Sequence, residues 1–225
     1  MRAVSGSYAE HGDAQMHEDD GLMIGPDSHP RCYWAATMMD YHDGEWGRPR
    51  RGDRELFERI CLEGFQSGLS WLTILRKRDA FRRAFHHFDI GHVARFTESD
   101  IERLMADADI IRNRAKIVSA INNARRALEL IKETGSLSDW LWSFAPKADQ
   151  RSESVDLARY REHTTSAESI ALSKALKKRG WSYVGPTTMY AMMQAVGMVN
   201  DHLDGCFVKG EVGAAGAREV APSAL

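Results

Sequence analysis

Two cysteine/histidine pairs lie near opposite ends of the 225-residue chain. Cys32 and His42 form the first pair, and His202 and Cys206, spaced like neighbours on one helical turn, form the second. Two thiolates and two imidazoles are the ligand set of a closed tetrahedral zinc site. Because most of the chain separates the pairs, a metal held by all four would tie both ends of one domain together. Two small apolar thiols near two histidines are the alternative that spacing alone leaves open.

A carboxylate among aromatic residues is the second group that could do chemistry. Glu63 lies between apolar residues at the end of an expected helix, directly before Gly64. This position suits either a solvated helix end or a hydrogen-bond acceptor at the lip of a cavity. The aromatic residues nearby could pack in a core or form a box for a planar, electron-poor ring: Trp34, Tyr41, Trp46, Phe65 and Trp71.

A turn rich in glycine and proline, from Trp181 to Thr188, leads directly into an expected helix. The free N–H groups and the positive dipole end of such a helix can hold an anion such as a backbone phosphate. An ordinary interhelical turn is the alternative. Basic residues directly upstream favour nonspecific contact with a DNA backbone: Lys174, Lys177, Lys178 and Arg179.

Composition restricts the classes of function. A net charge of −2 argues against a generally basic nucleic-acid coat, although local patches remain possible. Three cysteines do not suit a disulfide framework and indicate a reducing compartment. The sequence contains no apolar run of membrane-spanning length and no signal-peptide pattern. We therefore expect a cytoplasmic protein without a membrane partner, and a monomer, because no heptad pattern or extended apolar surface occurs.

The elements that must position these groups are predicted to be helices almost throughout. Capping residues followed by apolar side chains at helical spacing place helix starts at Asp53, Ser70, Asp79, Thr97, Asn113, Ser166 and Pro186. The helix from Asn113 to Thr134 is the longest, and Gly135, Gly180 and Gly197 mark helix ends. Since no alternating strand pattern of useful length occurs, the predicted class is all-α with many short helices.

The remaining segments are predicted to be loop or tail. Residues 147–163 are charged and without period, which indicates a loop. Residues 1–28 and 207–225 have the composition of disordered tails. A single domain is therefore expected over residues 29–206.

At the cysteine/histidine pairs, at Glu63 with its aromatic neighbours and at the glycine- and proline-rich turn, the chain resembles the DNA-3-methyladenine glycosylase I family of the helix-hairpin-helix glycosylases. The resemblance covers roughly residues 30 to 206. The matching blocks are Cys32-Tyr33-Trp34, Tyr41 to Gly47, Leu56-Phe57, Cys61 to Gly64, Gly68 to Trp71, Ile110 to Ile117, Leu172 to Gly180, and Val199 to His202 with Cys206.

The resemblance implies a fold and an activity. The fold is that of a helix-hairpin-helix glycosylase, with short helices in two sub-lobes and a zinc clasp between the N- and C-terminal segments. The activity is monofunctional excision of flipped-out 3-methyladenine from alkylated double-stranded DNA, which leaves an abasic site. The implied ligands of one structural Zn²⁺ are Cys32, His42, His202 and Cys206, while Cys61 is expected to be a buried thiol.

The family's site also carries over residue by residue. Glu63 is the implied catalytic residue, which accepts hydrogen bonds from the adenine edge. The implied base-binding rings are Trp34, Tyr41, Trp46 and Trp71; an aromatic face attracts a cationic methylated base by ~0.5–2 kcal/mol per contact. The implied DNA contacts are Gly185, Thr187, Thr188, Lys177 and Lys178.

Three positions depart from the wider pattern. Thr187 stands where bifunctional members carry a lysine nucleophile, so no Schiff base is expected. Asn200 occupies the place of the superfamily's catalytic Asp. Without a carboxylate there, we expect a modest rate enhancement of bond cleavage and a narrow specificity for a labile substrate. The stretch from Ala35 to Asp40 is shorter than in the family and lacks an aromatic residue, and Met38 or Met39 is expected to replace that wall.

Two hypotheses compete with the glycosylase. The first is a zinc-clasped helical DNA-binding module without activity; Glu63 among aromatic residues favours the enzyme instead. The second is a zinc hydrolase in which His202 and Cys206 hold a catalytic metal. A closed shell of four ligands argues against it, because catalysis needs an open coordination position.

Overall fold

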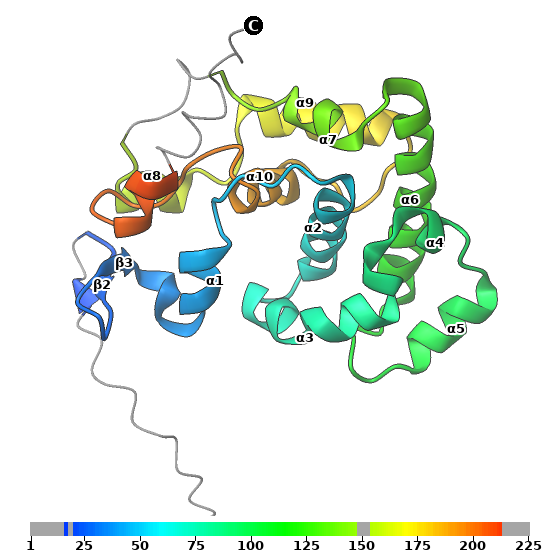
Figure 1. The fold of residues 1–225 in the computed structure, drawn as a ribbon, viewed down its shortest axis with the longest axis horizontal. Coiled ribbons are helices and arrows are strands. Elements are labelled where there is room, and N and C mark those ends of the chain that lie inside the picture. Colours follow the sequence, from blue (N-terminus) through cyan, green and yellow to red (C-terminus); the bar gives the residue numbers. More distant parts are fainter. Residues whose placement is uncertain (1–15, 18–19, 148–153, 213–225) are drawn as a thin grey trace, which may run out of the picture.

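The computed structural model describes residues 16–17, 20–147 and 154–212. The strands are β1 (Met16–His17), β2 (Leu22–Ile24) and β3 (Pro30–Cys32), paired antiparallel in that order. A 3₁₀ helix (Tyr33–Thr37) precedes the helices α1 (Met39–Gly44), α2 (Asp53–Gln66), α3 (Trp71–Ala84), α4 (Ile90–Ala94), α5 (Glu98–Ala106), α6 (Arg114–Thr134), α7 (Leu137–Trp142), α8 (Leu157–Glu162), α9 (Ala167–Lys178) and α10 (Pro186–Ala195), with a second 3₁₀ turn (His86–Phe88) between α3 and α4. The sheet lies at one end of the molecule and α4, α5 and α6 at the other (Figure 1). Among the described residues, no helix has both the length and the apolar character that a membrane span needs.

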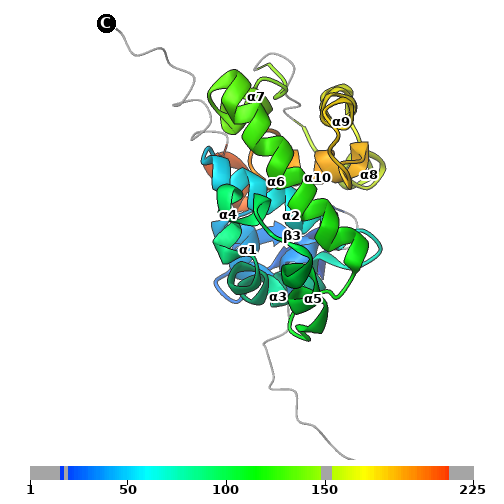
Figure 2. The same ribbon diagram turned by 90° about the vertical axis from the view of Figure 1, so that its right-hand side faces the viewer.

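Helix α2 lies at the centre of the helical body, where it packs against α3, α6, α7 and α10. Its buried face includes Leu56, Phe57, Ile60 and Phe65, each at most 1% exposed. The Phe65 ring lies 4.6 Å from the ring of Phe81 on α3. Helix α6 crosses the molecule with α7 beside its C-terminal end (Figure 2). Burial of each such side chain contributes about 1.5–3 kcal/mol, so packing fixes α2 within the helical body.

The turn between α2 and α3 is held by a lysine from α6. The Lys116 ammonium donates hydrogen bonds to the carbonyl oxygens of Phe65 (2.8 Å) and Ser67 (2.5 Å). A cation at this place stabilises the C-terminal end of α2. Ser70 then begins α3, because its side chain accepts a hydrogen bond from the Thr73 N–H at 3.2 Å. The end of α2 and the start of α3 are thereby fixed relative to each other.

The turn between α9 and α10 is likewise fixed by side chains. The Asn123 amide, on α6, accepts from the Ser182 N–H (3.0 Å) and donates to the Ser182 carbonyl (2.9 Å). On α9, the Ser173 hydroxyl donates to the Val184 carbonyl at 2.6 Å. Pro186 opens α10, where its missing N–H leaves no hydrogen bond unmade. The N-terminus of α10 is therefore presented in one defined orientation.

A second, smaller core joins the two ends of the chain. Leu22 from β2 packs with Leu157 from α8 and with Leu203. The close approach of backbone and side chains leaves no room for a side chain at Gly21, where an added Cβ would lie 2.6 Å from Leu157. Its φ of +71° is also one that glycine adopts most readily. The sheet, α8 and residues 203–212 thus form one packing unit beside the main helical body.

Most of the predicted helix starts are confirmed. Ser70, Asn113 and Ser166 cap helices through their side chains, Thr97 forms a capping box with Asp100, and Pro186 opens α10. The start predicted at Asp79 is wrong, because Asp79 lies inside α3. Helix α2 does begin at Asp53, as predicted, but the Asp53 side chain does not cap it. Its carboxylate instead accepts a hydrogen bond from the Ser138 N–H at 2.7 Å, near the start of α7.

The predicted helical class is confirmed in its coarse form, because the described residues are mostly helical. The expectation that no strands form is wrong, because β1, β2 and β3 pair in a small sheet. Strands of two or three residues are too short to show an alternating pattern. The predicted tail boundaries also change. Residues 20–28 belong to the hairpin region, and residues 207–212 are helical. The expected loop 147–163 contains α8. Residues 1–15 and 213–225 lie outside the described residues, and the single domain over 29–206 stays a prediction.

Candidate functional site

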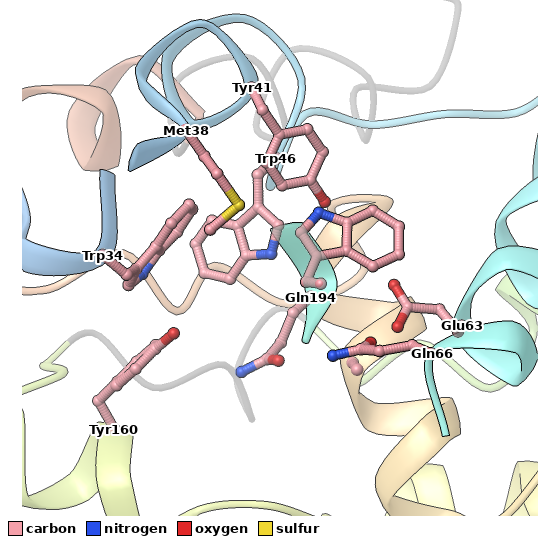
Figure 3. A pocket seen from close by; sticks show the side chains of 10 residues that line it. Trp34, Met38, Tyr41, Trp46, Glu63, Gln66, Tyr160 and Gln194 are labelled. Carbon is pink, nitrogen blue, oxygen red and sulfur yellow. The ribbon is translucent and has the colours of Figure 1, made fainter. Parts of the chain in front are cut away.

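A cavity of about 220 Å³ opens between α1, α2, α3, α8 and α10 (Figure 3). Its walls are formed by Trp34, Met38, Tyr41, Trp46, Glu63, Gln66, Trp71, Tyr160, Ala191 and Gln194. The rings of Trp34 and Trp46 meet nearly edge to face at 5.0 Å, and those of Tyr41 and Trp71 are tilted at 5.6 Å. The predicted box of Trp34, Tyr41, Trp46 and Trp71 around Glu63 is therefore present. Phe65 belongs to the helical core instead.

Glu63 presents a buried carboxylate to this cavity. Its side chain is 4% exposed, and its nearest charge is Arg59, one turn earlier on α2, whose Nη1 lies 3.6 Å from Oε1. Burial raises the pKa of Glu63 to about 7, although the Arg59 guanidinium opposes the shift. Near neutral pH, the carboxyl is therefore balanced between an anionic acceptor and a neutral acid.

Arg59 connects the carboxylate to the aromatic wall. Its guanidinium donates a hydrogen bond to the Tyr41 hydroxyl at 2.9 Å and lies 4.8 Å from the centre of the Trp71 ring. Burial raises the pKa of Tyr41 to about 12, so its hydroxyl stays protonated. Arg59 was not predicted from the sequence. Its position four residues before Glu63, on the same helix face, is the signal that could have found it.

Several donors in the cavity wall are unused. The indole N–H groups of Trp34 and Trp71 are buried and have no hydrogen-bond partner within the described residues. Buried donors without partners are rare in folded proteins and suggest an absent ligand or water. Met38, one of the two methionines expected to replace the missing aromatic wall of the Ala35–Asp40 stretch, lines the cavity.

The four predicted metal-ligand residues meet at one buried point. The candidate ligand atoms of Cys32, His42, His202 and Cys206 all lie within 4.8 Å of one another. Cys206 Sγ lies 3.5 Å from His42 Nε2 and 3.7 Å from His202 Nδ1. Bond lengths of a Cys₂His₂ site give a tetrahedral S–N edge of about 3.6 Å. The donor set and its spacing therefore fit a metal ion.

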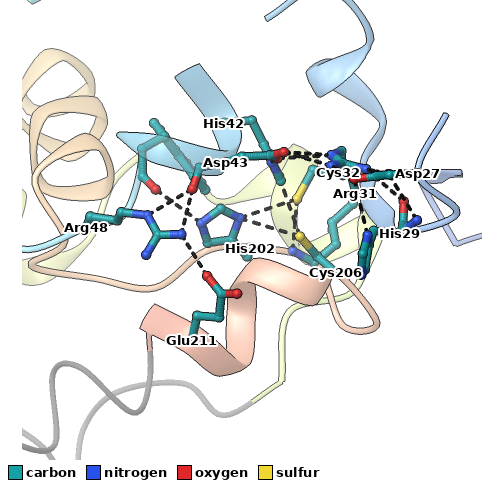
Figure 4. A network of polar contacts seen from close by, with 12 residues as sticks. Asp27, His29, Arg31, Cys32, His42, Asp43, Arg48, His202, Cys206 and Glu211 are labelled. Atoms are coloured by element: carbon teal, nitrogen blue, oxygen red, sulfur yellow. Dashed lines mark hydrogen bonds and ion pairs between the residues drawn. The ribbon is translucent and has the colours of Figure 1, made fainter. Parts of the chain in front are cut away.

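A shell of polar groups orients both imidazoles (Figure 4). His42 Nδ1 lies 2.7 Å from the Asp43 carboxylate, which also accepts hydrogen bonds from the Arg31 guanidinium at 2.8–3.0 Å. Asp27 holds the other side of Arg31 at 2.6 and 2.7 Å. An imidazole that donates from Nδ1 presents Nε2 as its free acceptor, which is the atom that faces Cys206.

The second imidazole links the cluster to the cavity. His202 Nε2 lies 3.3 Å from the Trp46 carbonyl oxygen, which leaves Nδ1 to face the two thiols. The Trp46 and His202 rings are also in edge contact at 4.6 Å, and Trp34 meets His42 at 4.9 Å. Two rings of the cavity wall thus rest directly on the cluster.

The residues expected to contact DNA lie together on the α9–α10 unit. Lys177 and Lys178 are exposed at the end of α9. Gly185 precedes α10, and Thr187 and Thr188 lie in its first turn. This places a helix N-terminus and two cations on adjoining elements, as a phosphate contact requires.

Asn200 does not line the cavity. Its amide donates to the Lys209 carbonyl at 2.9 Å. The neighbouring Asp201 accepts hydrogen bonds from Tyr190 (2.7 Å) and from Gln194 (2.8 Å), which is itself a cavity residue. Cys61 is a buried thiol, as predicted.

The fold and the cavity together define a mostly helical protein whose cavity has a largely aromatic wall. The sequence profile of the methyladenine glycosylase family matches residues 32–209. The chain belongs to this family.

Relatives of known structure and name agree with this assignment. DNA-3-methyladenine glycosylase 1 of Escherichia coli (strain K12) is 47% identical over 179 residues, which cover 78% of this chain and 95% of that protein. A crystal structure of 3-methyladenine DNA glycosylase I has 46% identity and a TM-score of 0.73, covering 79% of this chain and 98% of that one. A single-substitution variant of such an enzyme in complex with 3-methyladenine has 33% identity and a TM-score of 0.72, covering 77% and 92%.

The titration of Glu63 is a direct test of the site's electrostatics. We expect its carboxyl to titrate near pH 7, and Arg59→Met to raise the midpoint further by removing the opposing cation. Because the fold disfavours the Glu63 carboxylate, the free energy of unfolding should decrease as the pH rises from about 4.5 to about 7. Glu63→Gln should remove this part of the slope.

Carbon-13 NMR of glutamate carboxyls measures the midpoint. The signal should be absent in Glu63→Gln and present in Glu102→Gln, in which an exposed glutamate is replaced. A Glu63 midpoint in the ordinary glutamate range would contradict the buried-carboxylate description.

Proposed function

We propose that the protein is a monofunctional DNA N-glycosylase that excises 3-methyladenine from alkylated double-stranded DNA and leaves an abasic site. The observation that carries the proposal is the buried Glu63 carboxyl at a cavity walled by Trp34, Tyr41, Trp46 and Trp71. Membership of the methyladenine glycosylase family supports the same substrate.

The cavity suits a methylated adenine because that base is a cation. Each aromatic face attracts a cationic ring by ~0.5–2 kcal/mol more than a neutral one. The ionised Glu63 offsets the positive charge of Arg59 and accepts hydrogen bonds from the exocyclic amine of adenine. Guanine carries an acceptor oxygen at the same position, so the carboxylate repels it.

Cleavage of the glycosidic bond needs little catalytic assistance from the protein, because methylation at N3 already weakens this bond. The base leaves with the bonding electron pair as neutral 3-methyladenine, and water supplies the hydroxyl that attaches to C1′ while its remaining proton passes to the solvent. Thr187 offers no amine for a Schiff base, which makes the enzyme monofunctional. Asn200 is bonded to the Lys209 carbonyl, so binding in the cavity supplies most of the catalytic effect.

The α9–α10 unit serves as the hairpin that grips DNA. The N–H groups around Gly185, Thr187 and Thr188 bind a backbone phosphate, and Lys177 and Lys178 add sequence-independent attraction. The predictions of two sub-lobes, of a monomer and of a cytoplasmic location continue to rest on the sequence.

We infer that the Cys₂His₂ cluster holds one structural Zn²⁺. Buried thiols and imidazoles at tetrahedral spacing support this metal, and the oriented His42 and His202 have their second nitrogens already engaged. When bound, the ion supplies cross-linking of the chain ends rather than catalysis, because four protein ligands leave no open position. This arrangement disfavours the zinc hydrolase.

Base release from methylated duplex DNA tests the function. Free bases are separated and identified after incubation; we expect mainly 3-methyladenine, and an excision rate about 100-fold lower for Glu63→Gln, as when one key polar contact is removed. Asn200→Ala should cost much less, because its amide lies outside the cavity.

Equal losses for Glu63 and Asn200 would contradict the proposed division of roles, and release of mainly 7-methylguanine would contradict the narrow specificity. DNA binding without release of any base would identify the alternative, a zinc-clasped DNA-binding module.

The metal proposal predicts a role for Asp43. Asp43→Asn should weaken zinc binding about 10–100-fold, because His42 loses the carboxylate that orients it. Competition with a chromophoric chelator measures the affinity, and circular dichroism checks that the helices persist. Asp40→Asn replaces an exposed carboxylate on the same helix and should leave the affinity unchanged. Equal affinity in both variants, or purified protein without zinc, would refute the proposal.

A further inference from the structure

Tyr160 is a cavity residue that comes from outside the main helical body. It lies on α8, a helix that the sequence did not predict. The backbone before α8 is hydrogen-bonded to Asp204, which lies between His202 and Cys206. The Val155 N–H donates to the Asp204 carboxylate at 3.1 Å, and the Asp204 N–H donates to the Val155 carbonyl at 2.8 Å. Leu157 anchors the helix in the second core beside Leu22 and Leu203. Helix α8 is therefore held firmly enough to place a side chain.

The Tyr160 side chain is directed into the cavity. Its ring is in edge contact with Tyr33 at 6.2 Å. Figure 3 shows its hydroxyl pointing into the space between Trp34 and Gln194. No hydrogen bond of this hydroxyl occurs within the described part of the chain, and burial raises the pKa of Tyr160, so the group stays a neutral phenol. The ring lines the cavity and packs against the cluster of Tyr41, Trp46 and Ala195, so its position in the wall is fixed by neighbouring side chains.

The cavity has two distinct sides. Figure 3 places Glu63 and Gln66 on one side and Trp34, Met38 and Tyr160 on the other. The stretch from Ala35 to Asp40 supplies no ring of its own to that second wall. Tyr160 therefore provides an aromatic surface from a remote part of the sequence.

Purine geometry relates the two sides to the substrate. In adenine, N3 lies directly across the six-membered ring from C6, which carries the amine. If Glu63 accepts from the amine, the N3 substituent points away from Glu63 and toward the wall that contains Tyr160. A rigid ring in a closely packed wall limits the length of the substituent that can point toward it.

We propose that Tyr160 is a specificity-determining residue whose ring limits the size of the N3 substituent, so that methyl is accepted and longer alkyl groups are rejected. The proposal rests on the proposed excision of N3-alkylated adenine. It concerns the ring of Tyr160 and not its hydroxyl. One methylene in a pocket of fixed size changes discrimination by about 10–200-fold, which sets the expected scale.

The test compares release of 3-methyladenine and 3-propyladenine from duplex DNA treated with the corresponding alkylating agents. Tyr160→Ala should raise the propyl-to-methyl ratio of excision rates by about tenfold or more. Tyr160→Phe keeps the ring and should leave the ratio at the wild-type value. Ala158→Ser, at an exposed position of the same helix, is the matched control.

The outcomes separate the two proposals. If the wild type releases neither base, the glycosylase proposal fails. If it releases 3-methyladenine but Tyr160→Ala leaves the ratio unchanged, the Tyr160 proposal alone is overturned, and an increase for Tyr160→Phe as large as for alanine overturns it too. Melting curves report whether each variant folds. If Tyr160→Ala does not fold, Tyr160→Leu, which keeps an apolar side chain but no ring, replaces it. The propyl-to-methyl ratio of excision rates must then rise for Tyr160→Leu.

Discussion

The structure depends on the meeting of the chain's two ends at the Cys₂His₂ cluster. Residues 32–46 carry three rings of the cavity, yet they form only a 3₁₀ helix and one short helix. Their anchors are Cys32 and His42, which meet His202 and Cys206 from the other end of the domain. Because His202 Nε2 also faces the Trp46 carbonyl oxygen and the two rings are in contact, the cluster and the aromatic wall are in direct contact.

The opposite wall has a different physical basis. Glu63 is placed by α2, which lies at the centre of the helical body and whose end is held by Lys116. Burial favours the neutral form of Glu63, and Arg59 favours the anion, so the carboxyl responds to any charge that enters the cavity. A cationic ring favours the carboxylate strongly, whereas a neutral base leaves it closer to balance. In the proposed function, the preference for a cationic base follows from a Glu63 carboxylate that the protein alone stabilises only weakly.

Local signals made much of this fold predictable. Helix caps at Ser70, Asn113 and Ser166 depend on neighbouring residues, and the sequence contains all that is needed. Ligand chemistry alone suggests that the two cysteine/histidine pairs bind one metal ion. Only the family resemblance identifies all four as ligands of one site, because no local sequence pattern relates residues so far apart. The strands and the Tyr160 contact were missed, since short strands lack a period and the place of α8 is set by packing against β2 and Asp204.

We propose that a metal ion bound by the Cys₂His₂ cluster holds the aromatic wall in place, while the helical body is stable without the ion. The most direct measurement is binding of free 3-methyladenine, followed by tryptophan fluorescence, to protein before and after removal of the metal by a chelator. Far-ultraviolet circular dichroism on the same samples reports the helices. We expect metal-free protein to keep most of its helix content, to lose base binding, and to regain base binding when zinc is added. Unchanged base binding in the metal-free protein would show that the metal does not hold the aromatic wall.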